Sequence, residues 1–222
     1  MSPTAVAFVP AAPLLVPQLA GGSAAVDEEM RVRCLDVVSR ALDSDPQSVV
    51  AVATTAYPGT WNGEHSWDFA GFGVRRQETT RSSPLPWSLG IASWMLDEVG
   101  WSGPRRYVGV TVAEATPRID LPDRSVLVVV GDGSGCRTER APGHFDPRAE
   151  PFDDTVEDCL TRGDASALAA ADESLADDLL CTGLPAWRWL AGVVDGSPVA
   201  RAELLSHVAP YGVGYFVALW WF

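Results

Sequence analysis

The chain has 222 residues, of which 47% are hydrophobic and 20% charged, and this composition is typical of a globular protein and not of a disordered one. Its 29 acidic residues outnumber its 16 basic residues, and the net charge of −13 argues against DNA, RNA and anionic membrane surfaces as partners, because each requires a basic face. The length suits one domain over residues 1–222. We see no signal-peptide pattern and no apolar run near the ~20 residues that cross a bilayer, so we expect a cytoplasmic protein.

Strands and helices are predicted to alternate along the first part of the chain. Continuous apolar runs predict strands at Thr4–Val9, Ser48–Thr55, Arg106–Val112 and Ser125–Val130. Apolar residues at helical spacing predict helices over Ser23–Leu42 and Pro86–Val99, the second with Trp87 on its inner side. The stretch Tyr57–Ser83, rich in glycine and aromatic residues, is predicted to be irregular, with a short strand at Ala70–Val74.

The last third of the chain is predicted to be helical and then extended. Helices are expected after Pro151, after the capping residue Asp164, from the capping residue Asp172 to Gly183, and from Pro185. Strands are expected at Val199–Val208 and Val213–Trp221, and the acidic pairs at Asp153–Asp154 and Asp177–Asp178 are interpreted as solvated faces or first turns. The alternation of elements predicts a three-layer α/β domain, with a central mixed, mainly parallel sheet and helices on both faces.

Sites in open α/β sheets lie at the carboxyl ends of strands, and three segments qualify: Pro10–Pro13, Thr54–Pro58 and Gly131–Gly135. The ligand-binding candidates there and in the following loop are Ala11, Thr55, Tyr57, Asp132, Ser134 and His144. Glycines on both sides of Asp132 and Ser134 would let a ligand approach the backbone, and Arg137, Arg140 and His144 would favour an anionic or phenolic one. The alternative is an Asp/Ser turn that only caps the strand.

The histidines and cysteines show no metal-binding spacing. The three histidines, His65, His144 and His207, have no partner at i+2, i+3 or i+4, so no helical metal pair is predicted. The four cysteines contain no C-x-x-C motif, three of them fall in predicted helices, and we expect all four to be reduced. The apolar C-terminus, Trp220–Phe222, is either an edge strand packed on the core or an oligomer contact, which leaves a homo-oligomer open.

Three segments resemble a known superfamily. The opening Ala7–Gly21 (AFVPAAPLLVPQLAG) resembles the start of LigB-like proteins, the superfamily of class III extradiol ring-cleavage dioxygenases. The segments Gly131–Asp153 and Ala209–Trp220 resemble an actinobacterial branch of that superfamily. The resemblance implies an α/β fold and, in its active members, a non-haem Fe(II) held by two histidines and one glutamate, with another histidine as acid/base.

The sequence departs from this pattern where the iron ligands would stand. Pro10–Pro13 follows the first strand without a histidine, Thr54–Tyr57 follows the second strand without one, and Gly135 occupies a place where related enzymes carry a histidine. We therefore expect a LigB-like protein that has lost its iron site, has no cofactor, and acts as a small-molecule binder or a pseudoenzyme. The alternative is a dioxygenase or hydrolase with an unorthodox metal site, which would retain Fe(II) or another metal.

Overall fold

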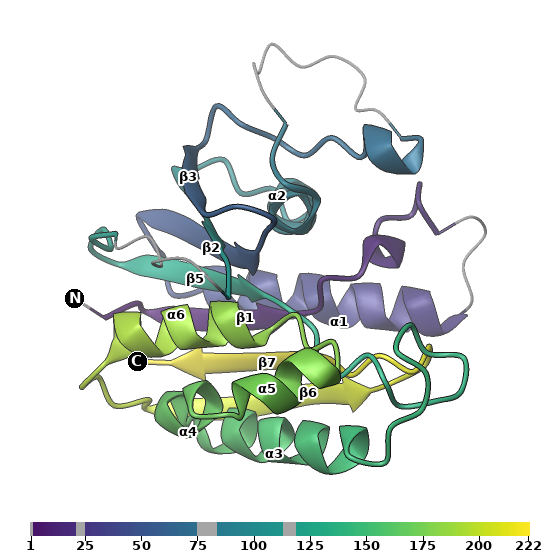
Figure 1. The fold of residues 1–222 in the computed structure, drawn as a ribbon. Coiled ribbons are helices and arrows are strands. Elements are labelled where there is room, and N and C mark those ends of the chain that lie inside the picture. Colours follow the sequence, from purple (N-terminus) through teal and green to yellow (C-terminus); the bar gives the residue numbers. More distant parts are fainter. Residues whose placement is uncertain (1, 21–24, 75–83, 113–118) are drawn as a thin grey trace.

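The computed structural model describes residues 2–20, 25–74, 84–112 and 119–222, and in these residues one sheet has the strand order β3-β4-β2-β5-β1-β7-β6 (Figure 1). The strands are β1 (Ala5–Val9), β2 (Ser48–Thr54), β3 (Gly59–Asn62), β4 (Arg105–Val110), β5 (Ser125–Val130), β6 (Arg201–Val208) and β7 (Tyr215–Trp221). The helices are α1 (Ala25–Leu42), α2 (Trp87–Glu98), α3 (Ala149–Arg162), α4 (Ala165–Ala169), α5 (Glu173–Asp178) and α6 (Leu184–Val194), with the 3-10 turns η1 (Pro13–Leu15) and η2 (Ala70–Phe72).

The four inner strands β4, β2, β5 and β1 run parallel, and antiparallel strands extend the sheet at both ends. On one side, β3 pairs with β4; on the other, β7 pairs with β1 and β6 with β7. The chain therefore closes its sheet by placing its last strand beside its first, with Ala5 opposite Trp221. The predicted α/β fold with a mixed sheet is confirmed.

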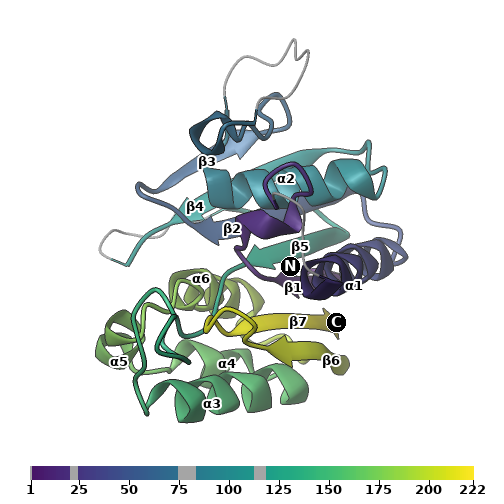
Figure 2. The same cartoon turned by 90° about the vertical axis from the view of Figure 1, so that its right-hand side faces the viewer.

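Helices cover both faces of the sheet (Figure 2). Helices α1 and α2 pack on one face with Ala5, Ala7 and Val9, while α3 to α6 pack on the other with Val6 and Phe8. Side chains alternate between the two faces of a strand, so strands this apolar must be covered on both sides. All six residues of β5 are buried, which agrees with its central place in the sheet.

Side-chain caps start two of the short helices as expected. The carboxylate of Asp164 accepts a hydrogen bond from the backbone N–H of Ala167 at 2.9 Å, and that of Asp172 accepts one from Leu175 at 3.1 Å. Each cap satisfies a backbone donor that the first helical turn leaves without a partner. Proline stands in the first turn of α6, where its missing N–H costs nothing.

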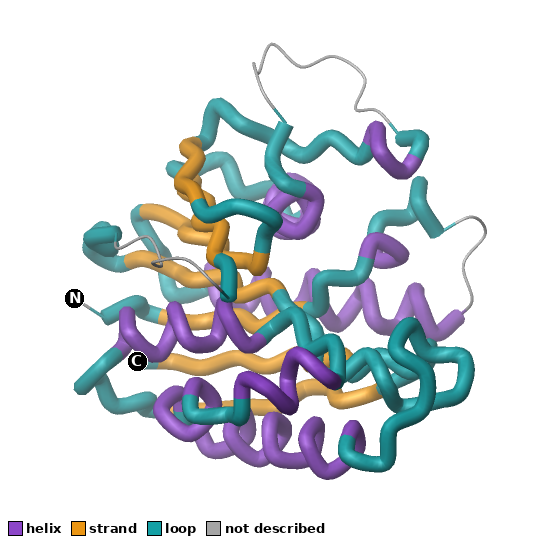
Figure 3. Tube along the Cα trace, in the orientation of Figure 1, coloured by secondary structure: helices purple, strands orange, loops and turns teal. Residues whose placement is uncertain are grey.

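Several predicted elements are wrong in detail. Ala70–Val74 is not a strand: η2 forms a single turn between loops (Figure 3), and β3 was not expected. Helix α3 begins two residues before Pro151, and α5 ends at Asp178, so Cys181 lies in a loop and not in a helix. Trp87 at the start of α2 is 44% exposed and does not face the core. The start predicted for the first helix, Ser23, lies outside the described residues.

Within the part of the chain that the structure describes, no helix combines the length and the apolarity that a membrane span requires.

Candidate functional site

At the carboxyl ends of the neighbouring strands β1 and β5, the two connecting segments run to opposite faces of the sheet. From β1 the chain continues to α1 on one face, and from β5 it continues to α3 on the other. Such a topological switch point is where open α/β sheets place their ligands, because the diverging loops leave the strand ends uncovered. The two ends are joined by a hydrogen bond of 3.0 Å from the N–H of Gly131 to the carbonyl of Val9.

Asp132 occupies this switch point. Its Oδ1 accepts a hydrogen bond of 2.8 Å from the backbone N–H of Ala11, the second residue after β1. Its own N–H donates to the hydroxyl of Thr182, and its carbonyl accepts from the N–H of Gly183 at 2.8 Å, just before α6. Two segments therefore fix Asp132: Ala11 holds its half-buried carboxyl group, and Thr182 with Gly183 holds its backbone. Its Oδ2 has no hydrogen-bond partner among the described residues.

The surroundings of Asp132 favour its neutral form. Burial raises the pKa of this carboxyl to about 7, and the hydrogen bond from Ala11 lowers it only in part. A carboxyl group that titrates near neutral pH can donate a hydrogen bond when protonated and accept one when ionised. Asp132 is therefore chemically suited to bind the hydroxyl or acid group of a small molecule.

Ser134, also a candidate, belongs to a buried network. Its N–H and its hydroxyl donate to the two carboxylate oxygens of Asp153, at 2.8 and 2.9 Å, and Ser134 itself is 0% exposed. The guanidinium of Arg137 donates to the same carboxylate at 3.0 Å and pairs with Glu150. Asp153 was expected on a solvated face, and this is wrong: it is 0% exposed. Its negative charge is compensated by Arg137, which was expected to favour an anionic or phenolic ligand instead.

Small residues let the loop after β5 pack this closely. A Cβ at Gly133 would lie 2.6 Å from Oδ1 of Asp153, and one at Gly214 would lie 2.4 Å from Oδ2. Backbone hydrogen bonds of 2.8 Å join the two segments, from Gly133 to Gly214 and from Gly214 to Ser134. Gly133 of the GDGSG motif and Gly214 thus allow tight packing around the buried carboxylate of Asp153, whereas Gly131 and Gly135 pack against Gly183 and Leu180.

Among the described residues, the remaining candidates Thr55, Tyr57 and His144 make no hydrogen bond to Asp132. The hydroxyl of Thr55 donates to the carbonyl of Tyr57 at 2.7 Å after β2, and Tyr57 is 60% exposed. His144 is exposed on the loop before α3, with a positive φ of 59° and its ring near the carbonyl of Glu139. Sequence reasoning missed Thr54, whose hydroxyl donates to the carbonyl of Thr182 at 2.6 Å and ties β2 to the segment that holds Asp132.

The residues at the switch point do not fit the iron site that the LigB resemblance implies. Ala11 and Ala12 offer no ligand atom where the first histidine would stand, and Asp132 is a single carboxylate. His65 bonds to Asn62 beside β3, and His207 lies on β6, three strands from β5. Among the described residues, one group of metal-ligating side chains converges, Asp154, Glu157 and His207, and it lies between α3 and β6.

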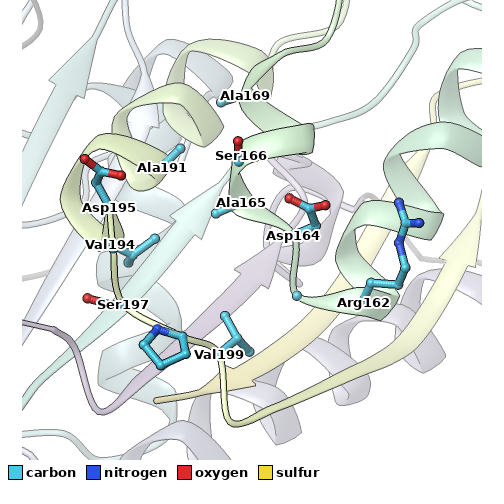
Figure 4. A pocket seen from close by; sticks show the side chains of 13 residues that line it. Arg162, Asp164, Ala165, Ser166, Ala169, Ala191, Val194, Asp195, Ser197 and Val199 are labelled. Atoms are coloured by element: carbon cyan, nitrogen blue, oxygen red, sulfur yellow. The ribbon is translucent and has the colours of Figure 1, made fainter.

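A cavity of about 520 Å³ lies at the opposite edge of the sheet, between α4 and the end of α6 (Figure 4). Two of its charged groups are already engaged, because Asp164 caps α4 and Arg162 pairs with Asp158, while Asp195 also lines it. Val194 and Val199 line it as well, and β6 begins just after them. We consider this cavity a weaker candidate site than Asp132, because ligands of open α/β sheets bind at the carboxyl edge and the cavity lies at the amino edge.

No protein-family model matches the sequence, and no curated protein is significantly similar to it. The geometry at the switch point and the chemistry of the side chains there therefore indicate what this protein can bind.

Proposed function

We propose that this protein binds a small phenolic or anionic molecule at the carboxyl edge of its sheet, with Asp132 as the anchoring group. The observation that carries the proposal is the carboxyl group at the switch point, held through Oδ1 by Ala11 and with a pKa of about 7. Its Oδ2 is left to face a ligand hydroxyl or acid group. Removing a carboxyl group from water is costly, and one whose pKa is raised to about 7 at the mouth of a sheet is a candidate for function.

Aromatic side chains near the same edge favour an aromatic ligand. Ser88, in the first turn of α2, donates to the carbonyl of Thr54 at 2.9 Å, so the start of α2 lies at the carboxyl end of β2. Trp87 is 44% exposed there, and its ring lies 6.1 Å from that of Phe72, which is 49% exposed. Exposed tryptophan and phenylalanine rings offer flat apolar surfaces for stacking. Together with a carboxyl group they suit a phenol or an aromatic acid.

The proposal includes a distant relation to LigB-like proteins in which the iron chemistry has been lost. The resemblance in the segments after β1 and β5 supports it, and the absence of ligand atoms at Ala11 and Ala12 argues against retained ring cleavage at this edge. The rival is a dioxygenase or hydrolase with a metal elsewhere. Oxygen uptake with catechol after loading with Fe(II) tests the dioxygenase alternative: we expect none above the rate of free iron.

A thermal-shift screen tests the binding function directly. Catechols, benzoates, aliphatic carboxylates and nucleotides would each be added at pH 6 and pH 8, on both sides of the pKa of about 7 for Asp132. We expect stabilisation by phenols or aromatic acids, because a ligand that binds only the folded state raises the melting temperature. The shift should be lost in Asp132→Asn.

A matched variant separates the site from general charge effects. Asp43 is exposed between α1 and β2, at the amino edge, and Asp43→Asn removes the same charge far from the switch point. We expect this variant to keep the full thermal shift. Equal shifts in wild type, Asp132→Asn and Asp43→Asn would place the ligand elsewhere, and no shift with any compound class would reject a phenolic or anionic ligand.

A further inference from the structure

Helix α3 carries a negative charge that arginine does not neutralise. Three of its acidic residues have arginine partners: Glu150 and Asp153 pair with Arg137, and Asp158 pairs with Arg162. Among the described residues, Asp154 and Glu157 have no such partner. These two carboxylates are three positions apart, so they lie on one face of the helix and repel each other. Their repulsion can be compensated only by a group on the neighbouring element that packs against this face.

The residue that faces them is His207 on β6. Its Nδ1 lies 2.6 Å from Oε2 of Glu157, and its ring stacks on Phe216 with centroids 4.4 Å apart and an interplanar angle of 23°. The imidazole side chain is 11% exposed, whereas that of Glu157 is 43% exposed. Packing therefore fixes the position of the imidazole ring of His207, whereas the exposed side chain of Glu157 can rotate.

A β-bulge brings His207 to this face of the sheet. Ala202 and Leu204 pack towards α3, and Leu205 packs towards α1. Strict alternation would send His207 to the α1 side. The register shift between Leu204 and Ser206 reverses the alternation, so that His207 pairs with Phe216 and points to α3. Bulges are known to redirect a side chain in this way.

We propose that Asp154, Glu157 and His207 bind a divalent transition-metal ion, with Zn²⁺ as the best match to one imidazole and two carboxylates. The three ligand atoms already lie within 4.8 Å of one another. A tetrahedral zinc ion with bonds of about 2.0–2.2 Å needs its ligand atoms roughly 3.3 Å apart, which small rotations of the exposed carboxylates supply.

The ion would connect the edge strand β6 to α3 and leave a coordination position for water. Three protein ligands plus water is the arrangement of open zinc sites, whereas purely structural sites are closed by four protein ligands. The ion would neutralise the two unpaired carboxylates, and it would replace the hydrogen bond between His207 and Glu157. The site is separate from Asp132, and its binding of metal does not depend on the function proposed there.

Zinc titration of the metal-free, reduced protein tests the proposal. Competition with a chromophoric chelator would measure affinity in wild type, Asp154→Asn and His207→Gln. We expect one Zn²⁺ per chain, weakened about tenfold or more in each variant. Asp154 is exposed, so we expect Asp154→Asn to fold normally. This variant therefore tests the proposal even if His207→Gln fails to fold.

Two control variants remove the same kinds of group outside the proposed site. Asp158→Asn changes the neighbouring carboxylate on α3, and His65→Gln removes a half-buried histidine on a loop; both should bind zinc as wild type does. Absence of stoichiometric binding to the wild type would overturn the proposal. Equal affinity in wild type, Asp154→Asn and His207→Gln would also overturn it and assign the zinc to other side chains.

Discussion

Asp132 combines a fixed backbone position with a carboxyl group whose surroundings favour protonation. Because burial raises its pKa to about 7, the folded state binds this proton more tightly than the unfolded chain does. Protonated Asp132 therefore makes its full contribution to the free energy of unfolding below a pH of about 4, the pKa of an aspartate in the unfolded chain. This contribution is lost as the pH rises towards 7.

Asp132→Asn should remove this pH dependence, because asparagine does not titrate. The free energy of unfolding of the variant, minus that of wild type, should rise between about pH 4 and pH 7 and stay level above. A pKa difference of this size corresponds to on the order of 4 kcal/mol at most, and relaxation reduces it. Urea titrations at several pH values measure the difference. A difference that does not change with pH would mean that Asp132 is ionised like a surface aspartate.

Asp153 holds the loop after β5 against α3. Replacing it with alanine leaves the N–H and hydroxyl of buried Ser134, and the guanidinium of Arg137, without their acceptor. We expect Asp153→Ala to lower the free energy of unfolding by about 3 kcal/mol. Asp158→Ala, on the exposed side of the same helix, should change it by no more than about 0.5 kcal/mol. Comparable losses in urea denaturation would contradict the role assigned to the buried network.

Individual side chains show where sequence reasoning stops. The position of Asp132 at a strand end follows from the aliphatic run before it, so its place at the carboxyl edge is predictable. The burial of Asp153 is not, because its partners Ser134 and Arg137 are distant in the chain. His207 is harder still, since a single bulge decides which face of the sheet it joins.

At the scale of elements, β7 joins the first half of the chain to the last. Trp220 is 0% exposed, its ring lies 4.6 Å from that of Phe8, and its Nε1 donates to the carbonyl of Leu160 at 2.7 Å. Its neighbour Trp221 faces Arg40 and Arg201 and is half-buried. The strand is therefore held by very different environments on its two faces.

Two tryptophan variants measure this difference. Trp220→Ala should cost about 3–5 kcal/mol of stability, because it leaves a large cavity between β1 and α3 and an unpaired carbonyl at Leu160. Trp221→Ala should cost about 1 kcal/mol, since solvent and the arginine side chains can fill the space. Thermal or urea melts give both values. Equal costs would indicate that β7 is peripheral, in which case deletion of the last ten residues would leave a soluble protein.

The strands that consist of apolar residues were predicted from the sequence more accurately than those that do not. Strands β1, β2 and β5 are continuous aliphatic runs buried on both faces, and their limits agree with the prediction within a residue or so. Strand β3 (Gly59–Asn62) carries no such run and forms only because β4 offers a free edge. The segment Ala70–Val74 was predicted as a strand, but Ala70–Phe72 forms a turn, and Phe72 packs on the rings of Phe69 and Trp87.

For the molecule as a whole, the reactivity of the four cysteine thiols reports how well the core is shielded from solvent. All four are buried and free, and burial raises the pKa of each thiol, to about 12 for Cys181. Thiolates are the reactive form, so the folded protein should react slowly with thiol reagents. In denaturant all four should react at once. Fewer than four thiols in freshly prepared denatured protein, or rapid labelling of the native state, would contradict this picture.

The central claim is that a small molecule binds at the switch point beside Asp132. The most direct measurement is amide chemical-shift mapping of the best phenolic or aromatic acid from the thermal-shift screen on the folded protein. We expect the largest changes at Ala11, Thr54 and Gly133, together with their loss in Asp132→Asn. Changes centred on Arg162, Asp164 and Val199 would instead place the ligand in the cavity at the amino edge and rule out binding at Asp132.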